Sequence, residues 1–174
     1  RHGSSRVKRF WAELLDQAER TTRKYIAELP DGAYEFADNL DSDGIEARQV
    51  PIKIKLTIEG DGIEADFTGS SPQVQGSINS TLSMTKAATY FAVRSVLSAE
   101  IPNNGGFFRP IRVVAEKGSI LGCVLPAASG GRGVTMLRAA DVVFGALARA
   151  VPERVFAAGE GGPTLYSIGS YGED

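Results

Sequence analysis

The chain has 174 residues, of which 43% are hydrophobic and 23% charged, and its formal net charge is -2. This length fits one domain with a core large enough to be stable without disulfides or metals, and the composition excludes a disordered chain. The charge balance excludes a basic surface for nucleic acid. The most apolar runs, at residues 87–97 and 139–151, contain arginine or aspartate and are too short to cross a bilayer, so we expect no membrane partner.

Cys123 is the single cysteine, which excludes an internal disulfide framework and fits a reducing compartment. We therefore predict a cytoplasmic protein. The chain begins at Arg1 without a signal-peptide pattern, and its last residues, SIGSYGED, resemble an unfinished strand or turn. We interpret residues 1–174 as a single domain that is an internal fragment of a longer protein.

The segment from Arg6 to Leu29 predicts a helix, because its apolar residues fall three and four positions apart on one face. Ser4 or Ser5 can cap the start of this helix, and the turn residues 30–32 end it. The other face is charged, which is typical of a helix surface in contact with solvent.

Alternation of apolar and polar residues predicts strands at residues 33–38, 51–59, 63–67 and 111–115. A Gly-Asp-Gly turn joins the second and third of these into a β-hairpin, whose polar face sets Lys53 and Lys55 against Glu64 and Asp66. Residues 120–121 form a short apolar return, and residues 164–168 are one more candidate strand.

The acidic segment at residues 38–46 resembles a calcium loop only superficially. The calcium-loop pattern needs a glutamate where this sequence has Val50, so we interpret the segment as a solvated turn.

A loop at residues 69–79 leads into a predicted helix at residues 83–98 that is apolar on most of its circumference and therefore expected to be buried. Asn79, Ser80 and Thr81 stand just ahead of this helix. A helix N-terminus can bind an anion or a carbonyl oxygen, but capping is the commoner use of such side chains.

The segment IPNNGGFFRP follows this helix and must turn sharply, because it has two prolines, two asparagines and two glycines. Asn103, Asn104 and Arg109 either serve that turn or line a polar pocket, with donors suited to a substrate carbonyl or carboxylate. A second glycine-rich loop at residues 125–134 precedes a predicted helix at residues 135–150. Arg132 and Arg138 at that junction are candidates for holding an anionic ligand or a partner carboxylate.

Several kinds of catalytic chemistry are absent. The only histidine, His2, lies at the chain end, so neither a serine nor a cysteine triad is expected. One histidine and one cysteine far apart cannot make a zinc site, and Cys123 lies in an apolar stretch where a buried inert thiol is expected. The loops have no phosphate-binding motif.

Three segments together resemble the hydantoinase B/5-oxoprolinase family, to which the alpha subunit of acetone carboxylase also belongs. They are FWAELLDQAERTTRKYIAELPDGAYEFADNLDSDG, DFTGSSPQVQGSINS and IPNNGGFFRPIRVVAEKGSIL, in this order. The resemblance implies a partner, because members of the family work with an ATP-binding hydantoinase A partner or fused half. It also implies a reaction, in which ATP activates a cyclic amide carbonyl for ring opening or, in the carboxylases, activates a ketone and bicarbonate.

The resemblance transfers few functional residues. The family's metal-binding histidine and aspartate residues lie toward the N-terminal side of the matched part, so no metal site carries over to this chain. Many members have Asn-Cys where this sequence has Asn79-Ser80, so no thiol stands there. Asn79, Asn103 and Asn104 match recurrent positions of the family, but no catalytic role transfers to them.

We therefore predict an α+β fold in which an antiparallel sheet has one charged, open face and helices packed mainly on the other, namely those that begin at Arg6, Ser83 and Thr135. We expect part of an ATP-dependent enzyme that opens cyclic amides of the hydantoin or 5-oxoproline type; the alternatives are a non-catalytic docking segment for the ATP-binding partner or part of a carboxylase. The candidate residues are Asn79, Asn103, Asn104 and Arg109 for substrate, and Arg132 and Arg138 for an anion or partner; no catalytic residue is identified. The chain alone is expected to be inactive and to bind no cofactor, while ATP and a divalent metal are possible in the parent complex.

Overall fold

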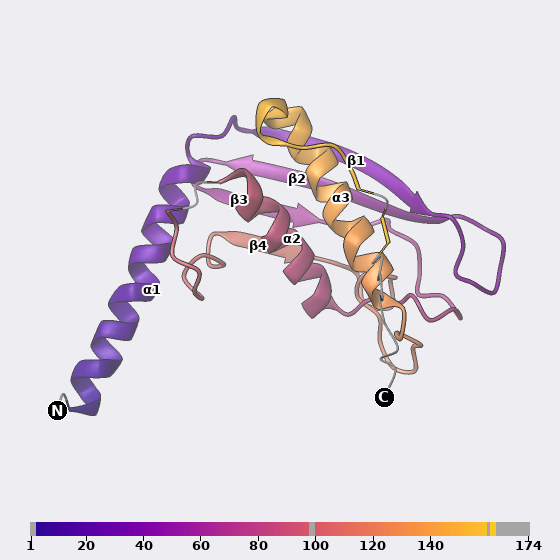
Figure 1. Ribbon diagram of the computed structural model, residues 1–174, viewed down its shortest axis with the longest axis horizontal. Coiled ribbons are helices and arrows are strands. Elements are labelled where there is room, and N and C mark those ends of the chain that lie inside the picture. Colours follow the sequence, from indigo (N-terminus) through magenta and orange to yellow (C-terminus); the bar gives the residue numbers. More distant parts are fainter. Residues whose placement is uncertain (1–2, 98–99, 160, 163–174) are drawn as a thin grey trace, which may run out of the picture.

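A computed structural model describes residues 3–97, 100–159 and 161–162, in which a four-stranded sheet carries two helices on one face while a third helix extends away from it (Figure 1). The elements in chain order are α1 (Ser4–Ile26), β1 (Gly32–Leu40), β2 (Val50–Glu59), β3 (Gly62–Asp66), α2 (Leu82–Val96), β4 (Ile111–Val114), α3 (Arg132–Ala150) and a short 3-10 helix (Pro152–Arg154).

The sheet has the order β1-β2-β3-β4 and confirms the predicted α+β class. The first three strands are antiparallel, as predicted, with Phe36 opposite Ile54 and Leu56 opposite Ala65. Strand β4 instead runs parallel to β3, with Ile63 opposite Ile111. The direction follows from the connection, because the chain crosses over through α2 before it returns to the sheet edge.

The two faces of the sheet differ as the alternation predicts. In β2 the apolar side chains Ile52, Ile54, Leu56 and Ile58 are buried, while the lysines between them are exposed. Glu64 of β3 forms an ion pair with β4 and not with the lysines of β2 that the sequence predicts as its partners. Its Oε2 lies 2.6 Å from Arg112 Nη1.

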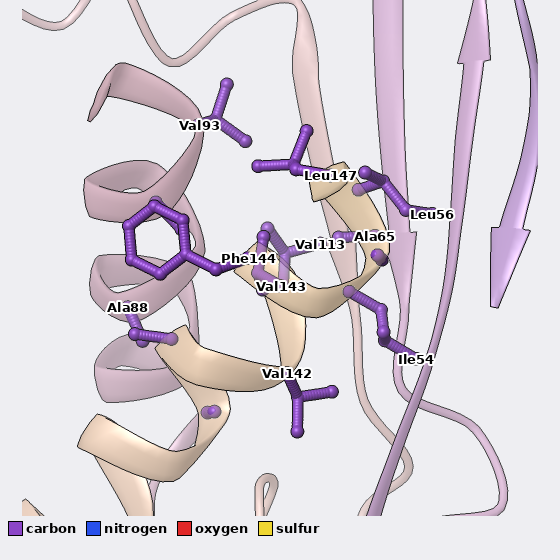
Figure 2. Packing of buried hydrophobic residues seen from close by; sticks show 14 of the residues in the cluster. Ile54, Leu56, Ala65, Ala88, Val93, Val113, Val142, Val143, Phe144 and Leu147 are labelled. Carbon is purple, nitrogen blue, oxygen red and sulfur yellow. The ribbon is translucent and has the colours of Figure 1, made fainter. Parts of the chain in front are cut away.

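The core lies between the sheet and the helices α2 and α3. Figure 2 shows side chains of α3 between those of α2 and the strands: Ala88, Val93, Val142, Val143, Phe144, Leu147, Ile54, Leu56, Ala65 and Val113. Gly145 of α3 lets the ring of Phe36 lie directly on the helix, since a Cβ at this position would be 2.5 Å from ring carbons. This contact holds α3 close to β1 and places its first turns beside the end of that strand.

Helix α1 does not cover the sheet, which corrects the prediction for the segment from Arg6. Only Ala18, Thr22 and Ile26 of this helix are buried, and its N-terminal half extends away from the rest of the molecule (Figure 1). Ser4 and Ser5 lie inside the helix, where Gly3 is the N-cap residue.

Smaller differences concern the loops. Residues 120–121 do not form a strand, although Ile120 N donates to Ser71 O and Ser119 forms an isolated bridge with Pro72. Cys123 is half-buried rather than buried. The candidate strand at residues 164–168 lies outside the described residues. None of the helices in the described part of the chain is both long and apolar enough to span a membrane.

Candidate functional site

The predicted site residues fall into two groups at opposite ends of α2, not into one pocket. Asn79 stands three residues before this helix, whereas Asn103, Asn104 and Arg109 follow it. The helix has 15 residues, and at about 1.5 Å per residue it spans roughly 22 Å. The structure therefore offers two separate places for function.

Asn79 organises the loop that precedes α2. Its side chain is fully buried, and Oδ1 accepts from Val74 N at 2.8 Å. Its amide Nδ2 donates to the carbonyl oxygens of Val74, Gly76 and Ala128 at 2.8, 3.0 and 2.8 Å. The amide is thus used to fold this loop and to join it to the loop before α3.

Asp43 fixes a third loop against the same place. Its Oδ1 accepts from Glu46 N and Ile45 N at 2.7 and 2.9 Å, and its Oδ2 accepts from Gly76 N at 3.1 Å. These backbone donors, led by those of Glu46 and Ile45, lower the pKa of the Asp43 carboxyl group. Gly76 is required here, because a Cβ on it would lie 1.8 Å from the Asp43 carbonyl oxygen.

The three loops meet where both core helices begin, and we name this region the loop end, defined as residues 41–48, 69–81 and 123–131. Gly131 N donates to Ser77 O at 2.8 Å, and Thr135 Oγ1 donates to Ile78 O, so the start of α3 is bonded to the approach to α2. Gln73 bridges the outer part of the loops through Val124 N and Pro126 O. Among the described residues, the side chain of Thr81, the N-cap residue of α2, makes no capping hydrogen bond, which corrects the capping expected there; the N-cap residue of α3 is Gly131, which has no side chain. Backbone bonds from Met84 N to Thr81 O and from Arg132 N to Ser129 O are formed at the two helix starts instead.

Arg138 forms the charged part of the region. Its Nη1 lies 2.6 Å from Asp38 Oδ2 and 3.9 Å from Asp141 Oδ2, and we name these three residues the Arg138 cluster. Burial raises the pKa of the Asp141 carboxyl group, an effect that the nearby guanidinium opposes. Arg138 Nε is buried and has no hydrogen-bond partner among the described residues.

Two cavities flank the Arg138 cluster. One of about 260 Å³ is lined by Leu40, Asp41, Ser42, Ile78, Val134, Arg138, Gly161 and Gly162. The other, of about 220 Å³, has the carboxylates of Asp38 and Asp141 in its wall, with the aromatic rings of Phe36, Phe144 and Phe156. Arg138 thus lines a small, partly polar cavity, and its Nε is a donor that a carbonyl oxygen could use.

Arg132, the other predicted arginine, is exposed at the first turn of α3. Its Nη1 donates to Ser129 O at 3.0 Å, so part of its hydrogen-bonding capacity serves its own loop.

The second group of predicted residues docks the 101–110 loop on α1. Arg109 Nη1 lies 2.7 Å from Asp16 Oδ1 and 2.9 Å from Glu19 Oε2, and hydrogen bonds from Arg109 and Arg23 lower the pKa of Glu19. Asn104 Oδ1 accepts from Gly106 N at 2.8 Å, while Asn103 is exposed. This arrangement fixes the loop in place.

The close approach of this loop to α1 depends on glycine. A Cβ on Gly106 would lie 1.9 Å from Leu15 O.

Sequence reasoning missed Asp38, Asp43 and Asp141. Two signals in the sequence could have found them. Asp43 precedes Gly44 in the acidic turn, and Asp141 is the one carboxylate among the apolar residues of its helix. Over the residues that the structure describes, no three His, Cys, Asp or Glu side chains are grouped so that they could hold a metal ion.

Known proteins similar to this chain share its fold. A model of the family described as hydantoinase B/oxoprolinase matches residues 1–174. The B-type subunit of a putative D-/L-hydantoinase from Pseudomonas sp. (strain NS671) is 35% identical over 168 residues, which are 90% of this chain and 28% of that protein.

Two solved structures extend the likeness. The ATP-dependent caprolactamase from Pseudomonas jessenii matches with a TM-score of 0.79 and 28% identity over 88% of this chain and 27% of its own. An acetone carboxylase matches with a TM-score of 0.75 and 16% identity over 88% of this chain and 22% of its own, a likeness of fold alone.

Proposed function

The chain belongs to the hydantoinase B/oxoprolinase family, and from this premise we propose that it is one region of the B-type subunit of an ATP-dependent enzyme that opens cyclic amides. One observation carries the proposal: the family match over all 174 residues, which the likeness to the ATP-dependent caprolactamase supports. The likeness to acetone carboxylase is one of fold and favours no carboxylation.

This region works as part of a larger assembly. The chain spans 28% of the hydantoinase relative and 27% of the caprolactamase chain, so most of such a subunit lies outside it. We propose that ATP is bound by a hydantoinase A-like subunit or fused half, since the matching hydantoinase relative is itself one subunit of its enzyme. The 174 residues alone do not hydrolyse cyclic amides, and their cytoplasmic location stays a prediction that rests on the single cysteine.

In this assembly the loop end and the Arg138 cluster contribute one wall of the substrate site. The starts of α2 and α3 face the loop end, and a helix N-terminus favours negative charge. Arg138 adds a guanidinium beside a polar cavity. These groups suit the carbonyl oxygen of a cyclic amide, on which negative charge grows when the ring opens.

Asn79 and Asp43 position this wall without touching substrate. Their hydrogen-bonding groups already bind the loop backbone. Asn103 and Arg132 are exposed, so both could reach a substrate, and a substrate contact by either remains a prediction.

The experiment that tests the proposal uses the full-length subunit carrying this sequence together with its ATP-binding partner. Ring opening of 5-oxoproline, hydantoin and caprolactam is followed by chromatography with and without ATP. We expect ring opening of at least one of them that requires ATP and both components. Ring opening without ATP, or by one component alone, would overturn the proposal.

A non-catalytic docking role is the second candidate function, and a specific observation favours it. The N-terminal half of α1 carries large apolar side chains that the described part of the chain does not cover. A segment whose only role is docking would tolerate loss of the Arg138 guanidinium with unchanged kcat, and the Arg138→Met variant of the full complex separates the two functions.

A further inference from the structure

One face of α1 is apolar along the whole helix, but the molecule covers only part of it. Toward the C-terminal end, Ala18, Thr22 and Ile26 on this face are fully buried. Toward the N-terminal end, Phe10, Trp11 and Leu14 are 41%, 63% and 52% exposed. The exposed residues continue the same three-and-four spacing as the buried ones, so they extend one hydrophobic face beyond the core.

The apolar face of α1 is covered only as far along the helix as its contact with the 101–110 loop. Gly106 lies so near the Leu15 carbonyl oxygen that only glycine fits, and Asn104 Nδ2 is 3.4 Å from Leu14 O. The N-terminal half of the helix extends alone from the molecule (Figure 1). We name the side chains of Val7, Phe10, Trp11 and Leu14 the α1 stripe.

Basic side chains outnumber acidic ones around the α1 stripe, where the acidic neighbour Glu13 lies 3.8 Å from Arg9. Arg6 and Arg9 lie near the Phe10 ring, with their guanidinium carbons 5.5 and 5.9 Å from its centroid. Lys8 is also exposed on this first part of the helix. The open surface beside Phe10 and Leu14 is lined by α1 alone and also carries Arg20. An occupant with an apolar stripe and flanking carboxylates would match this surface in polarity and charge.

We propose that an apolar, acid-flanked segment of the same subunit, from the polypeptide beyond these 174 residues, covers the α1 stripe. This inference rests on the proposed function, because it takes the chain as part of a longer subunit, and the chain spans 28% of the hydantoinase relative. Cover within one subunit fits better than a separable partner, because the stripe continues a core face and permanent interfaces are more apolar than transient ones.

The test measures how fast a thiol reagent reaches cysteines placed on two sides of α1. Leu14→Cys lies on the stripe, and Ala12→Cys is the matched control, exposed two residues earlier and about 200° away around the helix. Both are made in the full-length subunit with Cys123→Ser, and modification by N-ethylmaleimide is quantified at each peptide by mass spectrometry. The subunit is purified without its ATP-binding partner, and each rate is divided by that of the unfolded protein.

We expect Leu14→Cys to react at least tenfold more slowly than Ala12→Cys in the subunit alone, at all protein concentrations. Protection that appears only when the ATP-binding partner is added would overturn the inference and assign the stripe to that partner. Protection that is lost on dilution would overturn it in favour of a second copy. Equal rates under all conditions would show that nothing covers the stripe.

A second measurement keeps the inference testable if the cysteine variants fold poorly. Hydrogen exchange of the backbone amides at residues 7–14 in the unmodified subunit should be as slow as at residues 18–26, and fast exchange there contradicts the inference. Neither measurement uses ATP or substrate, so each tests the cover of the α1 stripe independently of the proposed activity. The stripe can be covered although no cyclic amide is opened, and a cyclic amide can be opened although the stripe is not covered.

Discussion

Arg138 of α3 and Asp38 of β1 are 100 residues apart in the sequence, and their side chains meet at 2.6 Å. The pair lies where β1 ends beside the first turns of α3, close to the loops that Asn79 and Asp43 hold together. Asp141, one helical turn after Arg138, completes the cluster at 3.9 Å. A charged group and a set of rigid loops are thus brought to one end of the molecule, and this supports a role in substrate positioning.

Replacing Asn79 by alanine should destabilise the protein strongly. The change leaves Val74 N and carbonyl oxygens of the two loops without their side-chain partner, and each buried polar group so orphaned costs about 1–3 kcal/mol. We expect the free energy of unfolding in urea to fall by roughly 2–4 kcal/mol. Asn103→Ala, at an exposed position, is the control and should change it by less than about 0.5 kcal/mol. Equal effects of the two variants would contradict the role of Asn79.

Replacing Gly76 by alanine should separate two of the loops. The added Cβ would meet the Asp43 carbonyl oxygen at 1.8 Å, so the backbone must move and the bond from Gly76 N to Asp43 is lost. We expect the unfolding free energy to drop by more than about 2 kcal/mol. Gly133→Ala is the matched control, because open space surrounds this glycine in α3 and alanine favours a helix by about 0.5–1 kcal/mol. Tolerance of Gly76→Ala would show that these loops are not held together as described.

The carboxyl group of Asp141 should make stability depend on pH. Burial raises its pKa above the ordinary value, so the folded state binds the proton more tightly than the unfolded state. This contribution to stability is full below the unfolded pKa of about 3.9 and is lost as pH rises through the folded pKa. Urea titrations at pH 4 and pH 7 should therefore show that Asp141→Asn gains stability relative to the original protein as pH rises. A relative gain as pH falls would contradict the effect of burial.

Arg109 should act as an anchor for its loop rather than as a substrate ligand. It contacts Asp16 and Glu19 of α1 at an exposed site, where water and salt screen ion pairs so that they contribute little to stability. We expect Arg109→Ala to lower the unfolding free energy only slightly, less than Asn79→Ala does, and to leave kcat/KM of the assembled enzyme unchanged.

A double-mutant cycle supplies the control for this prediction. If the anchor is the role of Arg109, the effects of Arg109→Ala and Glu19→Ala on stability are less than additive. Additive effects on stability, together with a large loss of kcat/KM in Arg109→Ala alone, would instead assign Arg109 to the substrate.

Local patterns in the sequence predict most of the elements. The alternation in β2 and β3 and the helical spacing in α1, α2 and α3 place these elements within about three residues of their observed bounds. The direction of β4 cannot be predicted in this way, because the alternation of apolar and polar residues looks the same in a parallel and an antiparallel strand. It depends on the crossover through α2, which no local pattern encodes.

The site is less predictable for a related reason. Asn79 can be selected as a candidate from its residue type and its position before a helix. Its partner Ala128 lies 49 residues away in the sequence and comes close only in the folded chain. The two asparagine-bearing loops are neighbours in sequence and yet are separated by the length of α2. Likewise, the spacing of Trp11 and Leu14 shows that one face of α1 is apolar without showing what covers it.

The most direct test of the proposed function is the mass of the product formed by the full-length subunit and its ATP-binding partner from a cyclic amide, ATP and ¹³C-bicarbonate. We expect a ring-opened product that has gained the elements of water, carries no ¹³C and requires ATP. A product that contains ¹³C, or ring opening that proceeds equally without ATP, would contradict assignment of this chain to an ATP-dependent cyclic amide hydrolase.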